Sequence, residues 1–220
     1  MKILPLYLTI ISLLCTGLCI AQVKDGVRDD FPIQITEDYY RARKWERFDK
    51  PDFGSLYSYY PKNVVTIEGI PCGTQFTLTA KGELYGFILA QDFELKGTLL
   101  PKNSRFEPYV RNNRMDDYMI YLPEDTKIQG YMVRHKGSFM QDYHVDFYKH
   151  GALKGFKPTT DIVIDGIPCR GGKKNSWISL FPDKKLQSCF LSRDFEIENK
   201  SYNKGSQLTF NAKGNVTINY

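Results

Sequence analysis

The sequence predicts an all-β protein of stacked short antiparallel strands, arranged in about four to five repeats of about 32 residues that form an elongated or rolled sheet. Three observations support this fold class. The phrase Ile67–Cys72 (IEGIPC) returns as Ile164–Cys169 (IDGIPC). A shorter motif that overlaps this phrase recurs along most of the chain. The chain also holds 15 Tyr and 14 Phe, and aromatic residues favour strands.

The composition of residues 1–21 predicts an export signal. Lys2 supplies the positive start, Leu4–Ile20 is apolar or small, and small residues precede a cut before Gln22. The apolar run is slightly shorter than the about 20 residues of a membrane-spanning helix, so a cleaved signal is favoured over an uncleaved anchor. We therefore expect no stable membrane span after cleavage, and a secreted, periplasmic or cell-surface location.

Residues 22–62 predict an N-terminal cap or linker. Glu37–Phe48 is charged, aromatic and free of Gly and Pro, which allows a short helix there. Pro51 and Pro61 indicate an extended lead-in to the repeats. A cap would cover the first sheet edge, which is prone to aggregation when exposed. The alternative is a docking arm, because Tyr, Trp and Arg are enriched at interfaces.

Residues 63–220 form the predicted β-repeat domain. The motif D-x-x-[IL]-x-[GN] occurs four times, and a truncated copy around Gly69 opens the series. Its final Gly or Asn predicts a turn with positive φ. Apolar pairs such as Val145/Phe147 alternate with polar residues, which is typical of strands with one buried face. We expect about three short strands in each unit and a core shared between neighbouring units.

The aspartates that begin this motif are Asp92, Asp125, Asp161 and Asp194. Asp at the start of a turn can accept a hydrogen bond from the backbone two residues on. A ladder of aspartates could also bind calcium, but calcium-binding repeats usually place several Gly and Asp in one short turn. Each turn here offers one Asp, so turn-capping is the favoured interpretation.

The segments VDFYKHGAL (Val145–Leu153) and LTFNAKGNV (Leu208–Val216) resemble the MORN-like repeats of exported and antitoxin-type bacterial proteins. The resemblance covers roughly residues 64 to 220. It implies hairpins that stack into an elongated antiparallel sheet, and a scaffold or interaction surface without catalytic residues. The usual repeated Tyr-x-Gly is absent, and the D-x-x-I-x-G element is additional, so the resemblance concerns architecture.

Cys72, Cys169 and Cys189 occupy repeat positions that other units fill with apolar side chains. Buried free thiols are therefore favoured, because free Cys behaves as a small hydrophobe. A disulfide between Cys169 and Cys189 is the alternative that an export route would permit. A catalytic or metal-bound thiolate is disfavoured because no CxxC or cysteine–histidine cluster is present.

Asp142, His144 and Asp146 are the candidate metal ligands. If Val145 and Phe147 face the core, these three side chains share the opposite face. They could hold a divalent cation or form a solvated face with cross-strand charge pairs, and the second interpretation is favoured. His135 and His150 fall in nearby loops and could add ligands. No catalytic or cofactor-binding residue is predicted, because no nucleophile elbow, P-loop or dinucleotide fingerprint is visible.

The net charge of +5 is scattered along the chain, which argues against nucleic-acid binding. We expect an exported, non-catalytic binding or structural module at the cell envelope, with rows of Tyr, Lys and Arg contacting an envelope polymer or a protein partner. The alternative is an envelope metal-assisted hydrolase with a site near Asp142, His144 and Asp146. A third class, a carrier whose sheet cradles a lipid or glycan, rests on the aromatic content alone.

Overall fold

A computed structural model describes residues 39–46, 55–111, 114–136, 143–172 and 175–217. Every regular element among these residues is a β-strand, and the predicted all-β class is confirmed. The chain divides into two compact units, Met1–Ala90 and Gln91–Tyr220. The predicted signal at residues 1–21 lies outside the described residues.

The first unit is an antiparallel arrangement in the order β1-β2-β4-β5, with β3 also paired to β4. Its strands are β1 (Tyr39–Glu46), β2 (Ser55–Pro61), β3 (Val65–Ile67), β4 (Ile70–Thr79) and β5 (Leu84–Leu89). The short helix considered for Glu37–Phe48 is wrong, because residues 39–46 form β1. Pairing with β2, whose Tyr59 is fully buried, outweighs the weak helix propensity of this segment.

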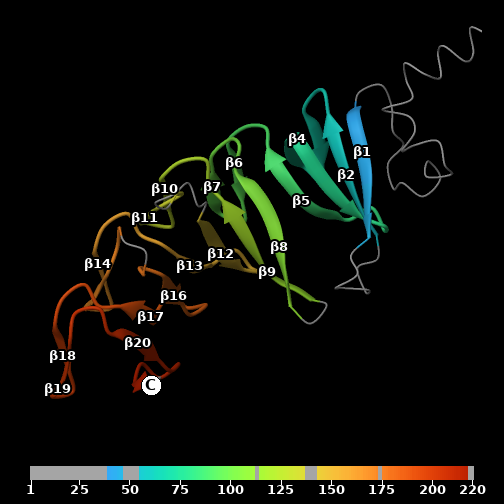
Figure 1. Cartoon of the computed structure of the whole chain (residues 1–220). Helices are drawn as coiled ribbons and strands as arrows, with labels where there is room; N and C mark the ends of the chain where they lie inside the picture. The colour runs from blue at the N-terminus through green and yellow to red at the C-terminus, as the bar shows by residue number, and fades with distance from the viewer. Residues whose placement is uncertain (1–38, 47–54, 112–113, 137–142, 173–174, 218–220) are drawn as a thin grey trace, which may run out of the picture. The chain divides into compact units, whose positions relative to one another are not determined.

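The second unit combines a larger sheet with four small hairpins (Figure 1). The sheet strands are β8 (Arg105–Arg111), β9 (Arg114–Tyr121), β12 (His144–Tyr148), β13 (Leu153–Phe156), β16 (Ile178–Leu180), β17 (Leu186–Phe190), β20 (Gln207–Phe210) and β21 (Val216–Thr217), adjacent in that order. The hairpins are β6 (Phe93–Leu95) with β7 (Thr98–Leu100), β10 (Thr126–Ile128) with β11 (Tyr131–Val133), β14 (Ile162–Ile164) with β15 (Ile167–Cys169), and β18 (Phe195–Ile197) with β19 (Lys200–Tyr202).

A repeat therefore contains four strands, two in the sheet and two in a small hairpin, and the expectation of about three strands is wrong. The difference arises because the I-x-G-I phrase is itself a complete two-residue hairpin, as Ile164 pairs with Ile167 across Asp165 and Gly166. Both turn residues have positive φ, 50° and 80°, which is the geometry of a type I′ turn. Asn199 replaces Gly at the last tip with a φ of 61°, as the sequence predicts.

The repeated aspartates clasp the base of each small hairpin. In the third of the four, Oδ1 of Asp161 accepts a hydrogen bond from the Gly171 N–H at 2.8 Å. The same bond joins Asp92 to Lys102, Asp125 to His135 and Asp194 to Lys204, always ten residues on. The backbone-capping role expected for these aspartates is confirmed, but the partner lies beyond the hairpin rather than two residues away.

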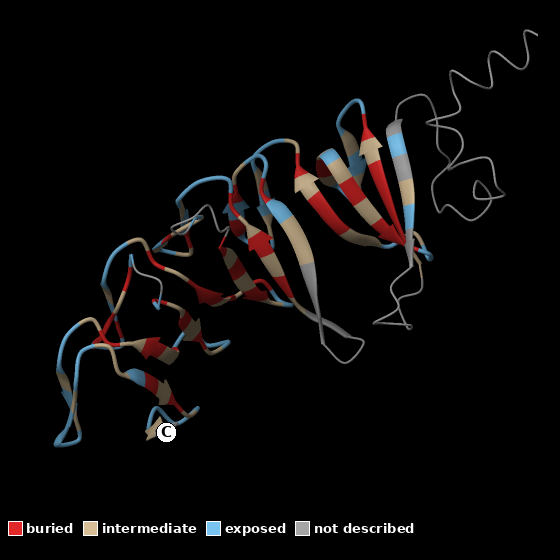
Figure 2. Ribbon diagram, in the orientation of Figure 1, coloured by how far each residue is buried: buried red, intermediate tan, exposed pale blue. Residues whose placement is uncertain are grey.

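The core of the second unit lies on the face of the sheet that carries the apolar pairs. Val145, Phe147, Ile178 and Leu180 are each at most 1% exposed, and buried residues alternate with intermediate ones along these strands (Figure 2). The inward isoleucines of the two middle hairpins, Ile128 and Ile164, are also buried, whereas Leu95 and Ile197 of the first and last hairpins are half-buried. The repeat columns read from the sequence therefore correspond to equivalent inward-facing positions, which are buried to different degrees.

Candidate functional site

The sequence-predicted candidates on β12 lie on the face of the sheet opposite the core. Val145 and Phe147 are buried, while His144 and Asp146 are half-buried on the other side, as the alternation predicts. Asp142 lies outside the described residues. The structure thus brings His144 and Asp146 together on one face, with 3.5 Å between His144 Nε2 and Asp146 Oδ1.

Three rings form a group across this face that we call the aromatic platform: Tyr121, His144 and Trp177. Tyr121 on β9 is the register partner of His144, and their ring centroids lie 5.9 Å apart. The Trp177 centroid lies 5.1 Å from that of His144. Aromatic side chains combine a large apolar surface with polar edges, which suits them to ligand contacts.

Gly155 makes room for the indole of Trp177. A Cβ atom at Gly155 would lie 2.5 Å from Cζ2 of Trp177, closer than real Cβ contacts. Gly155 is therefore required in the interior of β13 so that the indole can lie against the strand backbone. A glycine inside a strand often marks such a close approach, and this was the one sequence signal that could have pointed to the platform.

Asp146 carries a buried oxygen beside the imidazole of His144. Its Oδ1 has no hydrogen-bond partner among the described residues. Burial raises the pKa of Asp146 to about 6; nearby Lys154 opposes this shift and Asp117 adds to it. Burial also lowers the pKa of His144, assisted by Lys157. At neutral pH the site therefore presents a carboxylate beside a neutral imidazole.

A polar row continues the site along the same face. Lys154 forms an ion pair and hydrogen bond with Asp117. The Lys154 ammonium also lies 5.4 Å from the Tyr148 ring centroid, and the Arg105 guanidinium lies 4.2 Å from that of Tyr121. Such cation–π contacts hold the aromatic rings in place.

The rows of Tyr, Lys and Arg expected as a contact surface are largely arranged as pairs within the chain. The further cation–π pairs are Arg41–Tyr60, Lys44–Tyr57, Lys96–Tyr118, Lys157–Tyr143 and Lys200–Tyr202. One face of each of these tyrosines is therefore occupied by a cation of the chain itself. Trp177, which the sequence analysis did not single out, supplies the aromatic surface that sequence reasoning had assigned to tyrosine.

The remaining histidines do not join His144 to make a metal site. His135 bonds to Asp125, with 2.7 Å between Nδ1 and Oδ1, and the ring of His150 stacks on Tyr148 at 5.7 Å. Within the described ranges, no group of three or more His, Cys, Asp or Glu side chains is placed to hold a metal ion.

Cys72, Cys169 and Cys189 are free and buried, as predicted. The pKa of Cys169 is raised, first by a hydrogen bond with Cys189 and then by burial. Burial raises the pKa of Cys72 to about 11. The thiolate is the reactive form of cysteine, and a raised pKa disfavours it. The buried thiols therefore serve as apolar core side chains.

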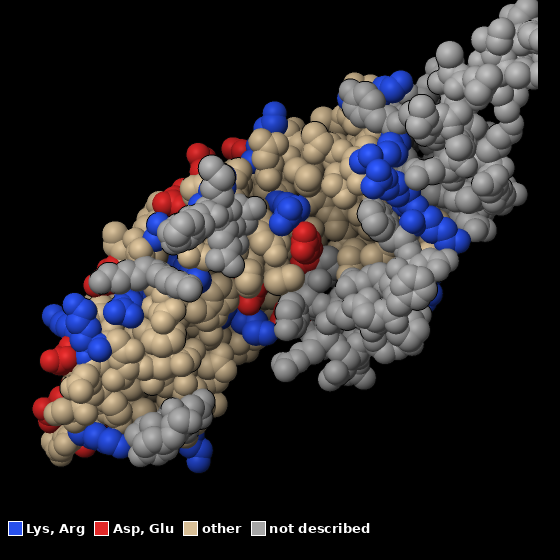
Figure 3. All heavy atoms as spheres, viewed as in Figure 1, with Lys and Arg blue, Asp and Glu red and all other residues tan. Residues whose placement is uncertain are grey.

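One area of the surface of the second unit has few charged side chains. In the view of Figure 3, the area over β16 and β17 carries few Lys, Arg, Asp or Glu side chains, while these gather along the margin. In the part of the chain that the structure describes, no helix is long and apolar enough to cross a membrane.

Comparisons with protein-family models, with curated proteins and with solved structures found no match for this chain.

Proposed function

We propose that the protein is an exported, non-catalytic binding module of the cell envelope, and that the aromatic platform with Asp146 is its contact surface for an envelope polysaccharide. The single observation that carries this proposal is the aromatic platform, in which the His144 ring centroid lies 5.9 Å from that of Tyr121 and 5.1 Å from that of Trp177, beside the half-buried carboxyl group of Asp146.

A sugar ring could contact both the aromatic rings and the Asp146 carboxylate of this site. One face of a sugar ring presents C–H groups that pack against flat aromatic rings such as Trp177. Its edge presents hydroxyl groups that can donate to the Asp146 carboxylate. The stacked hairpins fit a MORN-like scaffold, in which repeats present a broad surface without catalytic groups.

The test is sedimentation of the purified mature chain with bacterial peptidoglycan sacculi. We expect the wild type to bind, and Trp177→Ala to reduce the bound fraction at least tenfold because the largest ring of the platform is removed. Tyr202→Ala is the matched control, since Tyr202 is an aromatic residue with its own cation–π contact on the small hairpin β18–β19. We expect this control to bind like the wild type.

The pH dependence of binding tests the role of Asp146. Its pKa is raised to about 6, so the acceptor carboxylate is lost as the pH falls through 6, and binding should weaken there. Asp146→Asn should remove most of this dependence. The proposal is wrong if wild type does not sediment with sacculi, or if Trp177→Ala binds equally well. Stoichiometric metal lost on His144→Ala would instead support a metal-assisted hydrolase.

A further inference from the structure

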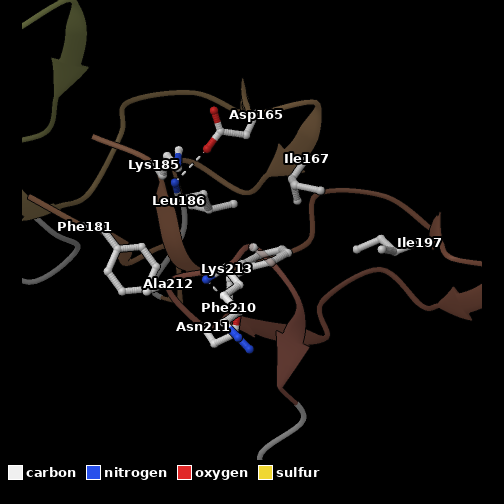
Figure 4. A pocket seen from close by; sticks show the side chains of 11 residues that line it. Asp165, Ile167, Phe181, Lys185, Leu186, Ile197, Phe210, Asn211, Ala212 and Lys213 are labelled. Atoms are coloured by element: carbon white, nitrogen blue, oxygen red, sulfur yellow. Dashed lines mark hydrogen bonds between the residues drawn. The ribbon is translucent and has the colours of Figure 1, made fainter. Parts of the chain in front are cut away.

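A second concave site lies in the last repeats, apart from the aromatic platform. A pocket of about 400 Å³ is enclosed by the small hairpins β14–β15 and β18–β19 and by the turns β16–β17 and β20–β21 (Figure 4). Its apolar wall consists of Ile167, Phe181, Leu186, Ile197 and Phe210. Its volume falls within the range of small-molecule sites, about 300–1,000 Å³.

The last repeats differ from the preceding repeat at positions around this pocket. Tyr131 stands one repeat earlier at the position of Ile167, and its ring packs on Phe156 at 5.0 Å. Phe181 and Pro182 similarly stand where the last turn has Asn211 and Ala212, respectively. The position of Ile167 thus carries an aromatic ring with a polar end one repeat earlier.

The tips of the hairpins β10–β11 and β14–β15 also carry side chains of different length. Gln129 spans from its tip to the next turn, donating to Gly151 O at 2.7 Å and accepting from Leu153 N at 3.2 Å. Asp165, the equivalent tip residue, is one methylene shorter and accepts from Leu186 N at 2.8 Å. The hollow beside Gln129 is open and polar, with Lys96, His150 and Lys184 in its lining, whereas the pocket beside Asp165 has an apolar wall.

The mouth of the pocket is polar and carries two lysines. Lys213 is exposed at the turn β20–β21, and Lys185 lies across the pocket beside Leu186 (Figure 4). The Lys185 ammonium is paired with Asp183 at 3.2 Å, and the Asp165 carboxylate is bonded to the Leu186 N–H. Lys213 is therefore the cation at the mouth best placed to meet an anionic ligand.

We propose that this pocket binds a medium-chain carboxylate, with its alkyl chain against Ile167, Ile197 and Phe210 and its carboxylate at Lys213. Burial of methylene groups against this wall provides the main attraction. The lysine supplies a charge-assisted hydrogen bond at the mouth. This site is independent of the polysaccharide contact, because none of its lining residues belongs to the aromatic platform.

Titration calorimetry with octanoate tests the proposal on the full mature chain. We expect saturable one-to-one binding with a dissociation constant below about 1 mM. Ile167→Tyr introduces the residue of the preceding repeat and should weaken binding at least tenfold by filling the pocket. Val163→Tyr is the matched control, because Val163 lies on the same hairpin and is 63% exposed, and it should bind like the wild type.

A second pair of variants tests whether the positive charge of Lys213 contributes to octanoate binding. Lys213→Glu should weaken octanoate binding at least threefold and leave 1-octanol binding unchanged. Lys81→Glu is its control, since Ala80-Lys81-Gly82 and Ala212-Lys213-Gly214 have the same sequence in equivalent turns.

Amide chemical-shift mapping of the wild type keeps the test decisive if Ile167→Tyr fails to fold. Octanoate should shift the amides of Leu186, Ile197 and Gly214. Absence of saturable binding, unchanged affinity in Ile167→Tyr, or shifts confined to other residues would overturn the assignment.

Discussion

The small hairpins in the middle of the second unit differ from the last one in how well their inward side chains are buried. Ile128 is 0% exposed and Ile164 is 4% exposed, whereas Ile197, at the same repeat position, is half-buried. A repeat cannot bury its apolar face alone and depends on its neighbours. The comparison shows that similar hairpin sequences reach different degrees of burial according to their place in the stack.

The tips of the middle hairpins and of the last hairpin also differ in their hydrogen bonds. Gln129 and Asp165 hydrogen-bond to the turn of the following repeat. Glu198, the equivalent residue of the last hairpin, is exposed. The middle hairpins are thus held by both apolar packing and tip contacts, and we expect them to be the more stable part of the unit.

The largest expected effect comes from truncating the buried isoleucines. Ile128→Ala should lower the free energy of unfolding by about 2–5 kcal/mol, because a fully buried side chain leaves a cavity. Ile197→Ala should cost markedly less, because solvent already reaches this position. Denaturant unfolding of both variants measures the difference, and equal losses would contradict the comparison.

An intermediate effect is expected from the aspartate clasps. Asp161→Ala leaves the partly buried N–H of Gly171 without its acceptor, which should cost about 1–3 kcal/mol. Asp194→Ala should cost less, since its bond to Lys204 N is exposed and water can replace the acceptor. Hydrogen exchange of the Gly171 and Lys204 amides provides the readout. The distinction fails if both amides lose protection to the same extent.

The smallest effect concerns the turn residues at the tips. Gly166→Ala should lower stability by about 1 kcal/mol, because its φ of 80° disfavours a side chain. A Cβ at Gly166 would meet no atom within 4 Å, so the cost is conformational alone. Asn199→Gly should raise stability by a few tenths of a kcal/mol, about the advantage of Gly at positive φ. In thermal unfolding, Asn199→Gly should have the highest midpoint temperature, the wild type an intermediate one and Gly166→Ala the lowest.

Local patterns in the sequence predicted much of the fold. The alternation around Val145 and Phe147 indicated both the strand and its buried face, and Gly166 and Asn199 indicated turns with positive φ. The cysteines were placed in the core because the aligned repeats have apolar residues there. These predictions succeeded because strand alternation and turn geometry depend on residues close together in the chain.

The candidate site was predicted only in part. Alternation placed His144 and Asp146 on one face, but it could not indicate that Trp177, which immediately precedes β16, lies against Gly155. The strand β1 was missed for a similar reason, since its conformation depends on pairing with β2 rather than on its own propensity.

The sequence alone determined that the chain is a series of β-hairpins with apolar residues in matched columns, because these features follow from short-range periodicity. Only the tertiary structure decided which hairpins bury their inward side chains, which rings lie beside His144, and that Ile167 lines a pocket. These properties depend on distances between side chains of neighbouring repeats, and such distances are set by the packing of the whole unit.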